Sequence, residues 1–259
     1  MRFDKILLIF FSFCGLCFLL VPFSFIILYA FSPNEKTFDF PIAEYTTKWF
    51  SIIVARSDVW NAVSLSFTVA FFATLLALII GTMTSIAVSR YKFFGRENFS
   101  LLLILPIALP GIITGIALRS SITILEIPFS TFTIVLGHAT FTIVVIYNNV
   151  IARLRRLHPN CLEASYDLGA NIFQAFFFVL LPQMYSALFA GAMLAFALSF
   201  DEIIVTTFTA GQQTTLPIWM LDQLIRPRQK PITNVVAIFI ILFTIIPIIY
   251  SFRILNKHA

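Results

Sequence analysis

Charged residues are scarce in this chain of 259 residues, at 11% of the sequence, whereas 59% of its residues are hydrophobic. A soluble domain of this length cannot bury so much apolar surface, which excludes soluble β-sandwiches and α/β enzymes. Uncharged runs of about twenty residues recur, and that length crosses the hydrocarbon core of a bilayer as a helix. Because helices satisfy their own backbone hydrogen bonds in lipid, the sequence predicts an all-α integral membrane protein.

Residues that carry chemistry are also few, with three cysteines and three histidines. Cys14 and Cys17 form a C-x-x-C pair inside an apolar run, without the second ligand pair of a zinc site. The acidic residues are scattered, and there is no H-E-x-x-H motif, no nucleophile elbow and no phosphate-binding G-x-x-x-x-G-K-[ST] loop. We therefore expect no enzyme activity, no metal and no cofactor in this chain.

The apolar runs predict six transmembrane helices in a single domain that covers 1–259. The predicted spans are 6–31, 61–88, 99–118, 131–151, 184–208 and 235–252. An even number of spans places both termini on one side of the membrane. Clusters of basic residues at 90–96 and 153–156 adjoin span ends and favour the cytoplasm for that side. The net charge of +5 is thus explained by topology, and no nucleic-acid partner is expected.

A long polar segment, the predicted cytoplasmic coupling loop 152–182, interrupts the apolar runs. Gly169 suits the left-handed conformation that ends many helices, and Asn171 can cap the start of a second helix. An isolated helix of about ten residues is marginal in water. We therefore expect a groove on another protein to receive it, the alternative being an ordinary connecting loop. The candidate contact residues are apolar Leu162 and Tyr166 and polar Glu163 and Asp167.

The spacing of this segment, from Glu163-Ala164-Ser165 through Gly169 to Leu181-Pro182, resembles the cytoplasmic signature loop of permease subunits of ATP-binding-cassette (ABC) importers. Val179 and Ser165 stand where that family usually has isoleucine and alanine, and both changes are small. The resemblance implies a type I ABC importer permease fold, a bacterial inner-membrane location and a loop coupled to an ATPase. The residues implied in that coupling are Leu162, Glu163, Ala164, Ser165, Tyr166, Asp167 and Gly169.

Motifs over most of the chain resemble the spermidine/putrescine branch of this family. They are Gly137-His138, Ala152-Arg153-Leu154, Ser199-Phe200-Asp201-Glu202 with Thr206, Phe208 and Gly211, and Leu216-Pro217. The resemblance implies an ATP-driven importer of polyamines that works by alternating access. It also implies the partners, which are a dimer of ABC ATPase subunits that binds ATP and Mg²⁺, a second and different permease subunit, an extracytoplasmic substrate-binding protein, and membrane lipid.

Two acidic residues, Asp201 and Glu202, lie late in the fifth predicted span. An acid near the bilayer centre costs about 2.5–3.5 kcal/mol on insertion scales, so such residues usually face a bundle interior or a water-filled cavity. One interpretation places them on the substrate path, in contact with a cation. The other pairs them with Arg119 or has them cap a helix end. His138 in the fourth span is a further candidate for the path, although a hydrogen-bonded packing role suits a single histidine better.

The substrate and the energy source leave alternatives open. The resemblance also extends to importers of other small solutes, including aminophosphonates and opines. A secondary transporter driven by an ion gradient, with Asp201 and Glu202 as coupling residues, would need no ATPase. That alternative predicts two symmetric halves with broken helices, and the first three spans contain no copy of the signature loop that would indicate a repeat. The permease of an ABC importer is therefore the leading prediction.

Overall fold

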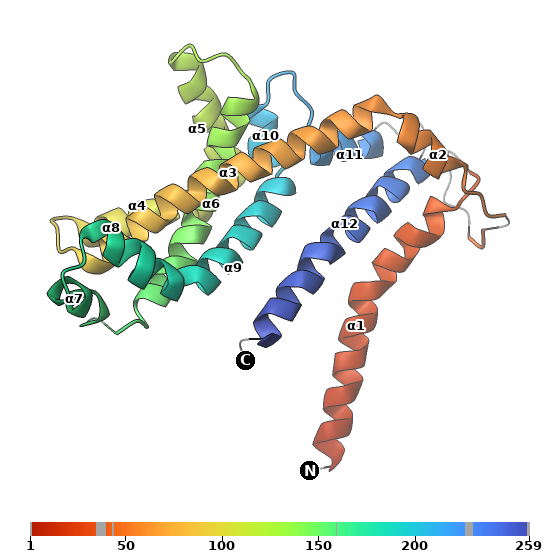
Figure 1. The fold of residues 1–259 in the computed structure, drawn as a ribbon. Helices are drawn as coiled ribbons and strands as arrows, with labels where there is room; N and C mark the ends of the chain where they lie inside the picture. Colours follow the sequence, from red (N-terminus) through yellow and green to blue (C-terminus); the bar gives the residue numbers. More distant parts are fainter. Residues whose placement is uncertain (1, 35–39, 43, 159, 226–229, 258–259) are drawn as a thin grey trace. The chain divides into compact units, whose positions relative to one another are not determined.

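The computed structural model describes residues 2–34, 40–42, 44–158, 160–225 and 230–257. Side chains are described for these residues except 2–4, 230 and 246–257. All regular elements within these ranges are helical, in agreement with the all-α prediction (Figure 1). The chain divides into two compact units: unit 1 comprises Met1–Trp60 and Trp219–Ala259, and unit 2 comprises Asn61–Ile218.

Unit 1 contains α1 (Arg2–Ala30), α2 (Lys48–Ala55) and α12 (Lys230–Lys257), and α12 packs against both of the others. Trp49 of α2 is fully buried, and its indole N–H donates a hydrogen bond to the Ser32 carbonyl at 2.7 Å. Along α1, by contrast, none of the most apolar stretch is buried inside the chain. A helix that is apolar on all sides and unburied requires lipid or another subunit around it.

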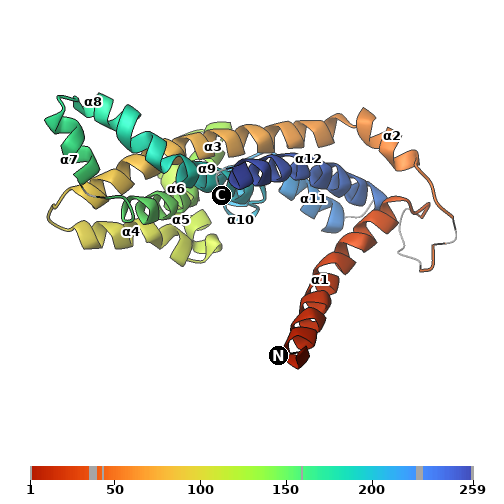
Figure 2. The ribbon, with the colours of Figure 1, turned by 60° about the horizontal axis from the view of Figure 1, so that its bottom comes forward.

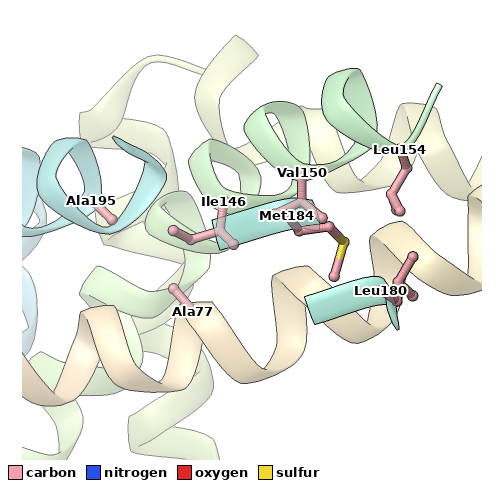
Figure 3. Packing of buried hydrophobic residues seen from close by; sticks show 7 residues of the cluster. All are labelled: Ala77, Ile146, Val150, Leu154, Leu180, Met184 and Ala195. Carbon is pink, nitrogen blue, oxygen red and sulfur yellow. The ribbon is translucent and has the colours of Figure 1, made fainter. Parts of the chain in front are cut away.

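α6 (Thr131–Leu154) is the central helix of unit 2, with over half of its apolar stretch buried inside the chain. Its Ile146 lies between two glycines on neighbouring helices. A Cβ added to Gly81 of α3 (Ser57–Arg90) would lie 2.8 Å from the Ile146 Cβ, and one added to Gly191 of α9 (Leu181–Phe200) would lie 3.1 Å from its Cδ1. Small residues of this kind let membrane helices approach closely. The buried cluster around Ile146 is completed by Ala77, Val150, Leu154, Leu180, Met184 and Ala195 (Figure 3).

Four helices in the described part of the chain are long and apolar enough to cross a membrane. They are Lys5–Ala30, Ser57–Arg90, Thr131–Leu154 and Ile172–Phe200, and they overlap the first, second, fourth and fifth predicted spans. α12 has 28 residues and overlaps the sixth; at 1.5 Å per residue it is about 42 Å long. The multi-pass membrane architecture agrees with the sequence, while the count of six spans stays a prediction.

The third predicted span, 99–118, is formed by two helices and not by one. α4 (Arg96–Ala108) and α5 (Gly111–Ile124) are bent by 104° at a short break. Pro110 has no N–H with which to continue the helix, and a residue that precedes proline is driven out of the helical region. Leu109 accordingly has a φ of −80° and a ψ of 144°. Pro110 therefore breaks the helix, whereas Pro106 lies inside α4 without interrupting it.

The fifth predicted span, 184–208, is shifted toward the N-terminus. Its helix covers Ile172–Phe200, so it begins inside the predicted loop 152–182. It stops at Asp201, after which come the short α10 (Ile204–Thr209) and α11 (Leu216–Ile225). The two acids that the sequence places inside a helix therefore lie at a break between helices.

Candidate functional site

The loop between α6 and α9 folds as a short helix, a turn and a second helix at one end of unit 2 (Figure 2). α7 (Asn160–Asp167) ends in a turn where Gly169 has a φ of +85°. The Gly169 N–H donates to the Tyr166 carbonyl at 2.8 Å. The Ala170 N–H donates to the Ser165 carbonyl at 3.0 Å. These two bonds form a Schellman motif, which needs a left-handed residue, so the helix end predicted at Gly169 is confirmed.

The second helix of the loop starts at Asn171. Its side-chain oxygen accepts a hydrogen bond from the Gln174 N–H, and the Gln174 side-chain oxygen accepts one from the Asn171 N–H, both at 2.9 Å. This reciprocal pair is a capping box, which confirms the cap predicted at Asn171. From it the helix continues through α8 (Ile172–Gln174) and the π-helical η1 (Ala175–Leu180) into α9.

The π-helical segment accommodates Pro182, near the start of α9. Proline has no N–H, and its ring clashes with the carbonyl four residues before it in an α-helix. In the widened turn, the Leu181 N–H donates to the Phe176 carbonyl, five residues back. The Gln183 side-chain amide donates to the Val179 carbonyl at 2.9 Å. The helix therefore passes the proline without a break and joins the loop directly to a membrane helix.

The inner face of this loop packs on unit 2. Leu162 is half-buried against the cluster around Ile146. Ser165 is buried, and its hydroxyl donates to the Leu162 carbonyl at 2.7 Å. At the base of the loop, the Arg153 Nε–H donates to the Gln183 carbonyl at 2.8 Å and ties the end of α6 to the start of α9. The sequence predicts that Leu162 faces another protein, whereas the structure places it against its own chain.

The loop also carries large apolar side chains that are exposed. The exposed fraction is 44% for Tyr166, 90% for Leu168, 59% for Ile172 and 72% for Phe173. Large apolar residues gathered on a polar, exposed loop are typical of a protein-interaction surface. We call the surface formed by these four residues and the exposed acids Glu163 and Asp167 the docking face.

Three residues of the docking face were missed by the sequence reasoning, which followed the signature spacing. Leu168 lies just before the Gly169 turn, and Ile172 and Phe173 lie just after it. Their signal was available, because they are large apolar residues on both sides of a helix-ending glycine in an otherwise polar segment. Ala164 and Gly169, the two remaining residues of the predicted coupling set, are exposed.

A second polar group lies among the membrane helices, around His138 of α6. His138 is buried, with Nδ1 2.7 Å from the Ser199 Oγ of α9 and Nε2 2.7 Å from the Thr206 Oγ1 of α10. The Thr206 hydroxyl donates its proton to the Glu202 carbonyl at 2.7 Å. Which ring nitrogen donates and which accepts depends on the tautomer of His138. These bonds join α6 to the helices on both sides of the break, and they leave both ring nitrogens occupied.

Asp201 and Glu202 lie at this break but differ in their surroundings. The Glu202 side chain accepts the Val205 N–H at 2.9 Å and so caps the start of α10. Asp201 is exposed at the end of α9. Neither acid pairs with Arg119 within the described ranges, where the Arg119 guanidinium lies 5.5 Å from the centre of the Phe129 ring. No group of three or more His, Cys, Asp or Glu among the described side chains is placed to hold a metal ion.

Comparison with known proteins identifies a family and several proteins that resemble this chain. Residues 73–259 match the family described as binding-protein-dependent transport system inner membrane component. The spermidine/putrescine transport system permease protein PotC of Escherichia coli (strain K12) is 28% identical over 226 residues, which are 87% of this chain and 86% of that protein. The putrescine transport system permease protein PotI of the same strain is 30% identical over 235 residues, which are 88% of this chain and 83% of that protein.

A solved structure shares the fold. It is the crystal structure of a bacterial ABC transporter involved in the import of the acidic polysaccharide alginate. One of its chains superposes with a TM-score of 0.69 at 17% sequence identity, over 99% of this chain and 95% of that chain. The likeness concerns the fold alone, and it agrees with the permease fold that the loop spacing predicts.

Proposed function

The chain belongs to the family of binding-protein-dependent transport system inner membrane components, and we propose that it forms one half of a pore through which polyamines enter the cytoplasm. It is the permease subunit of an ABC importer and not an enzyme. The observation that carries the polyamine proposal is the alignment of 87% and 88% of the chain with relatives named for spermidine and putrescine transport. Aminophosphonates and opines are the alternative substrates.

The docking face is the proposed contact with the ATPase. It combines exposed apolar side chains with the two acids Glu163 and Asp167, which suits an apolar groove with basic residues at its rim. ATP and Mg²⁺ are assigned to that partner, because this chain has no phosphate-binding loop. The helix that starts at Asn171 runs over Ile172–Phe200, about 43 Å at 1.5 Å per residue. A displacement of the docking face would therefore reach the break at Asp201 along one continuous helix.

The orientation follows from this assignment, since ATP is a cytoplasmic substrate. The docking face and the basic cluster at 153–156 belong to the same end of α6, so both are placed in the cytoplasm, with both termini on that side. The bacterial inner membrane is then the proposed location. The other proposed partners are a second, different permease subunit and an extracytoplasmic substrate-binding protein.

Reconstitution tests the proposed function. In proteoliposomes that contain this chain, its copurifying permease and ATPase, and the binding protein, spermidine uptake is expected to require ATP inside the vesicle. The same vesicles are assayed with a proton or sodium gradient and no ATP. Uptake by this chain alone, driven by the gradient, would show an ion-coupled secondary transporter and contradict the proposal. A ligand screen on the binding protein, with spermidine, putrescine, an aminophosphonate and an opine as probes, distinguishes the substrates.

Asp201→Asn is expected to lower the initial rate of spermidine uptake at least about tenfold, if its carboxylate contacts the cation in the pore. A hydrogen bond to a charged group contributes about 1.5–3 kcal/mol, and about 1.4 kcal/mol is a factor of ten. Asp201 is chosen because its side chain is exposed at the break. The uptake rate is measured at saturating binding protein, together with the basal ATPase rate, which should not change.

Glu202→Gln is the matched control for this prediction. The amide oxygen of glutamine can still accept the Val205 N–H, so the cap of α10 survives while the charge is removed. A fall of less than about threefold is expected for this variant. Unchanged spermidine uptake in Asp201→Asn would remove Asp201 from the substrate path, and a larger loss in Glu202→Gln would transfer the role to its neighbour.

A further inference from the structure

A polar groove lies between α6 and α9, at the end of these helices from which the docking face extends. It has a volume of about 470 Å³, and its lining includes Asn148, Asn149, Ala152, Arg153, Arg156 and Ser186. That volume is within the range of roughly 300–1,000 Å³ typical of small-ligand sites. None of these residues belongs to the docking face or to the polar group around His138. The groove is therefore a separate feature of unit 2.

The two arginines give this groove a positive charge that none of the described side chains neutralises. The Arg153 Nε–H is held by the Gln183 carbonyl at 2.8 Å, which orients the guanidinium, and its terminal nitrogens have no partner among the described residues. Arg156 is exposed and makes no hydrogen bond or ion pair with any residue the structure describes. No carboxylate lines the groove. A polyamine cation would be repelled there, so an anion is the complementary ligand.

We propose that this groove binds a phosphate group, carried by an anionic phospholipid headgroup or by a soluble phosphate compound. The planar fork of a guanidinium matches phosphate oxygens, and the two arginines are joined by neutral donors from Asn148 and Ser186. The small side chain of Ala152 also lines the groove. Basic pockets between membrane helices on the cytoplasmic side bind anionic headgroups. The side of the membrane rests on the orientation proposed above, whereas the phosphate chemistry does not.

The experiment compares ligand binding with matched variants of neighbouring residues. Native mass spectrometry measures the affinity of dioctanoyl phosphatidylglycerol and dioctanoyl phosphatidylcholine for the full chain, purified with its copurifying subunits and without ATP. Arg156→Gln removes one charge from the groove. Arg155→Gln removes the same charge from the adjacent exposed residue, which does not line the groove. Ala152→Leu narrows the groove and keeps every arginine. A second arm titrates inorganic phosphate, alone and in competition with phosphatidylglycerol.

The expected result is at least a tenfold preference for phosphatidylglycerol over phosphatidylcholine. Arg156→Gln and Ala152→Leu should each reduce that affinity by about tenfold or more, and Arg155→Gln by less than about twofold. Competition by inorganic phosphate identifies the phosphate as the recognised group. Binding of inorganic phosphate that depends on Arg156, without a preference between the lipids, assigns the site to a soluble phosphate compound. Equal losses in Arg155→Gln and Arg156→Gln, or wild-type binding in both Arg156→Gln and Ala152→Leu, would overturn the proposal.

Discussion

Gly169→Val is expected to reduce ATP-driven uptake by at least about tenfold while leaving membrane insertion intact. Gly169 has a φ of +85°, and the left-handed conformation costs an ordinary residue about 1–2 kcal/mol and a β-branched residue more. No atom lies within 4 Å of an added Cβ, so the cost arises in the backbone and not from a clash. Relieving it would open the Schellman motif and turn α7 away from the second helix. Uptake into proteoliposomes and the amount of chain in the membrane are measured together.

The chain offers a matched control at Gly95, at the start of α4. Gly95 has a φ of +80°, and an added Cβ there also meets nothing within 4 Å. Gly95→Val imposes the same backbone cost away from the docking face, and we expect uptake to change by less than about twofold. Gly169→Asn should retain more uptake than Gly169→Val, because asparagine tolerates the left-handed region. Equal losses at both glycines would mean that the effect is general destabilisation and not loss of the docking geometry.

The caps of this loop could be predicted because their causes are local. A glycine that ends a helix and an Asn171 that caps the next one act on the backbone within four residues, so the signal lies in the sequence itself. The family followed from the spacing within a single segment, between Glu163 and Pro182. The spans were predicted from composition, since lipid imposes the same length on any helix that crosses it.

The features that could not be predicted depend on which neighbour a side chain meets. Leu162 faces its own core because the cluster around Ile146 lies beneath α7, and no spacing in the sequence places that cluster there. His138 bonds to groups 61 and 68 residues away in the chain, Ser199 and Thr206. Glu202 was weighed as either a substrate contact or a helix cap, and only the break after α9 assigns it the cap. A buried polar group can be expected to form a hydrogen bond, but its partner depends on the tertiary structure.

The double variant Leu168→Ser, Phe173→Ser is expected to weaken binding of the ATPase by at least a hundredfold. Both side chains are exposed, at 90% and 72%, so their loss should cost the fold of this chain little. Burial of one such side chain at an interface stabilises it by about 1.5–3 kcal/mol, and about 1.4 kcal/mol is a factor of ten in affinity. Serine leaves the charge of the docking face unchanged. The affinity is measured by titrating purified ATPase onto the permease in nanodiscs.

Phe94→Ser is the matched control, because Phe94 is as exposed as a side chain can be and lies in the loop before α4. Its removal deletes one equally exposed apolar side chain on the side of the membrane that carries the basic cluster at 90–96, and no loss of ATPase binding is expected. A wild-type affinity in the double variant would contradict the docking face as the ATPase contact. If only Glu163→Gln and Asp167→Asn weakened binding, the acids and not the apolar residues would hold the partner. The affinity of the wild-type chain for the ATPase would then fall steeply with added salt.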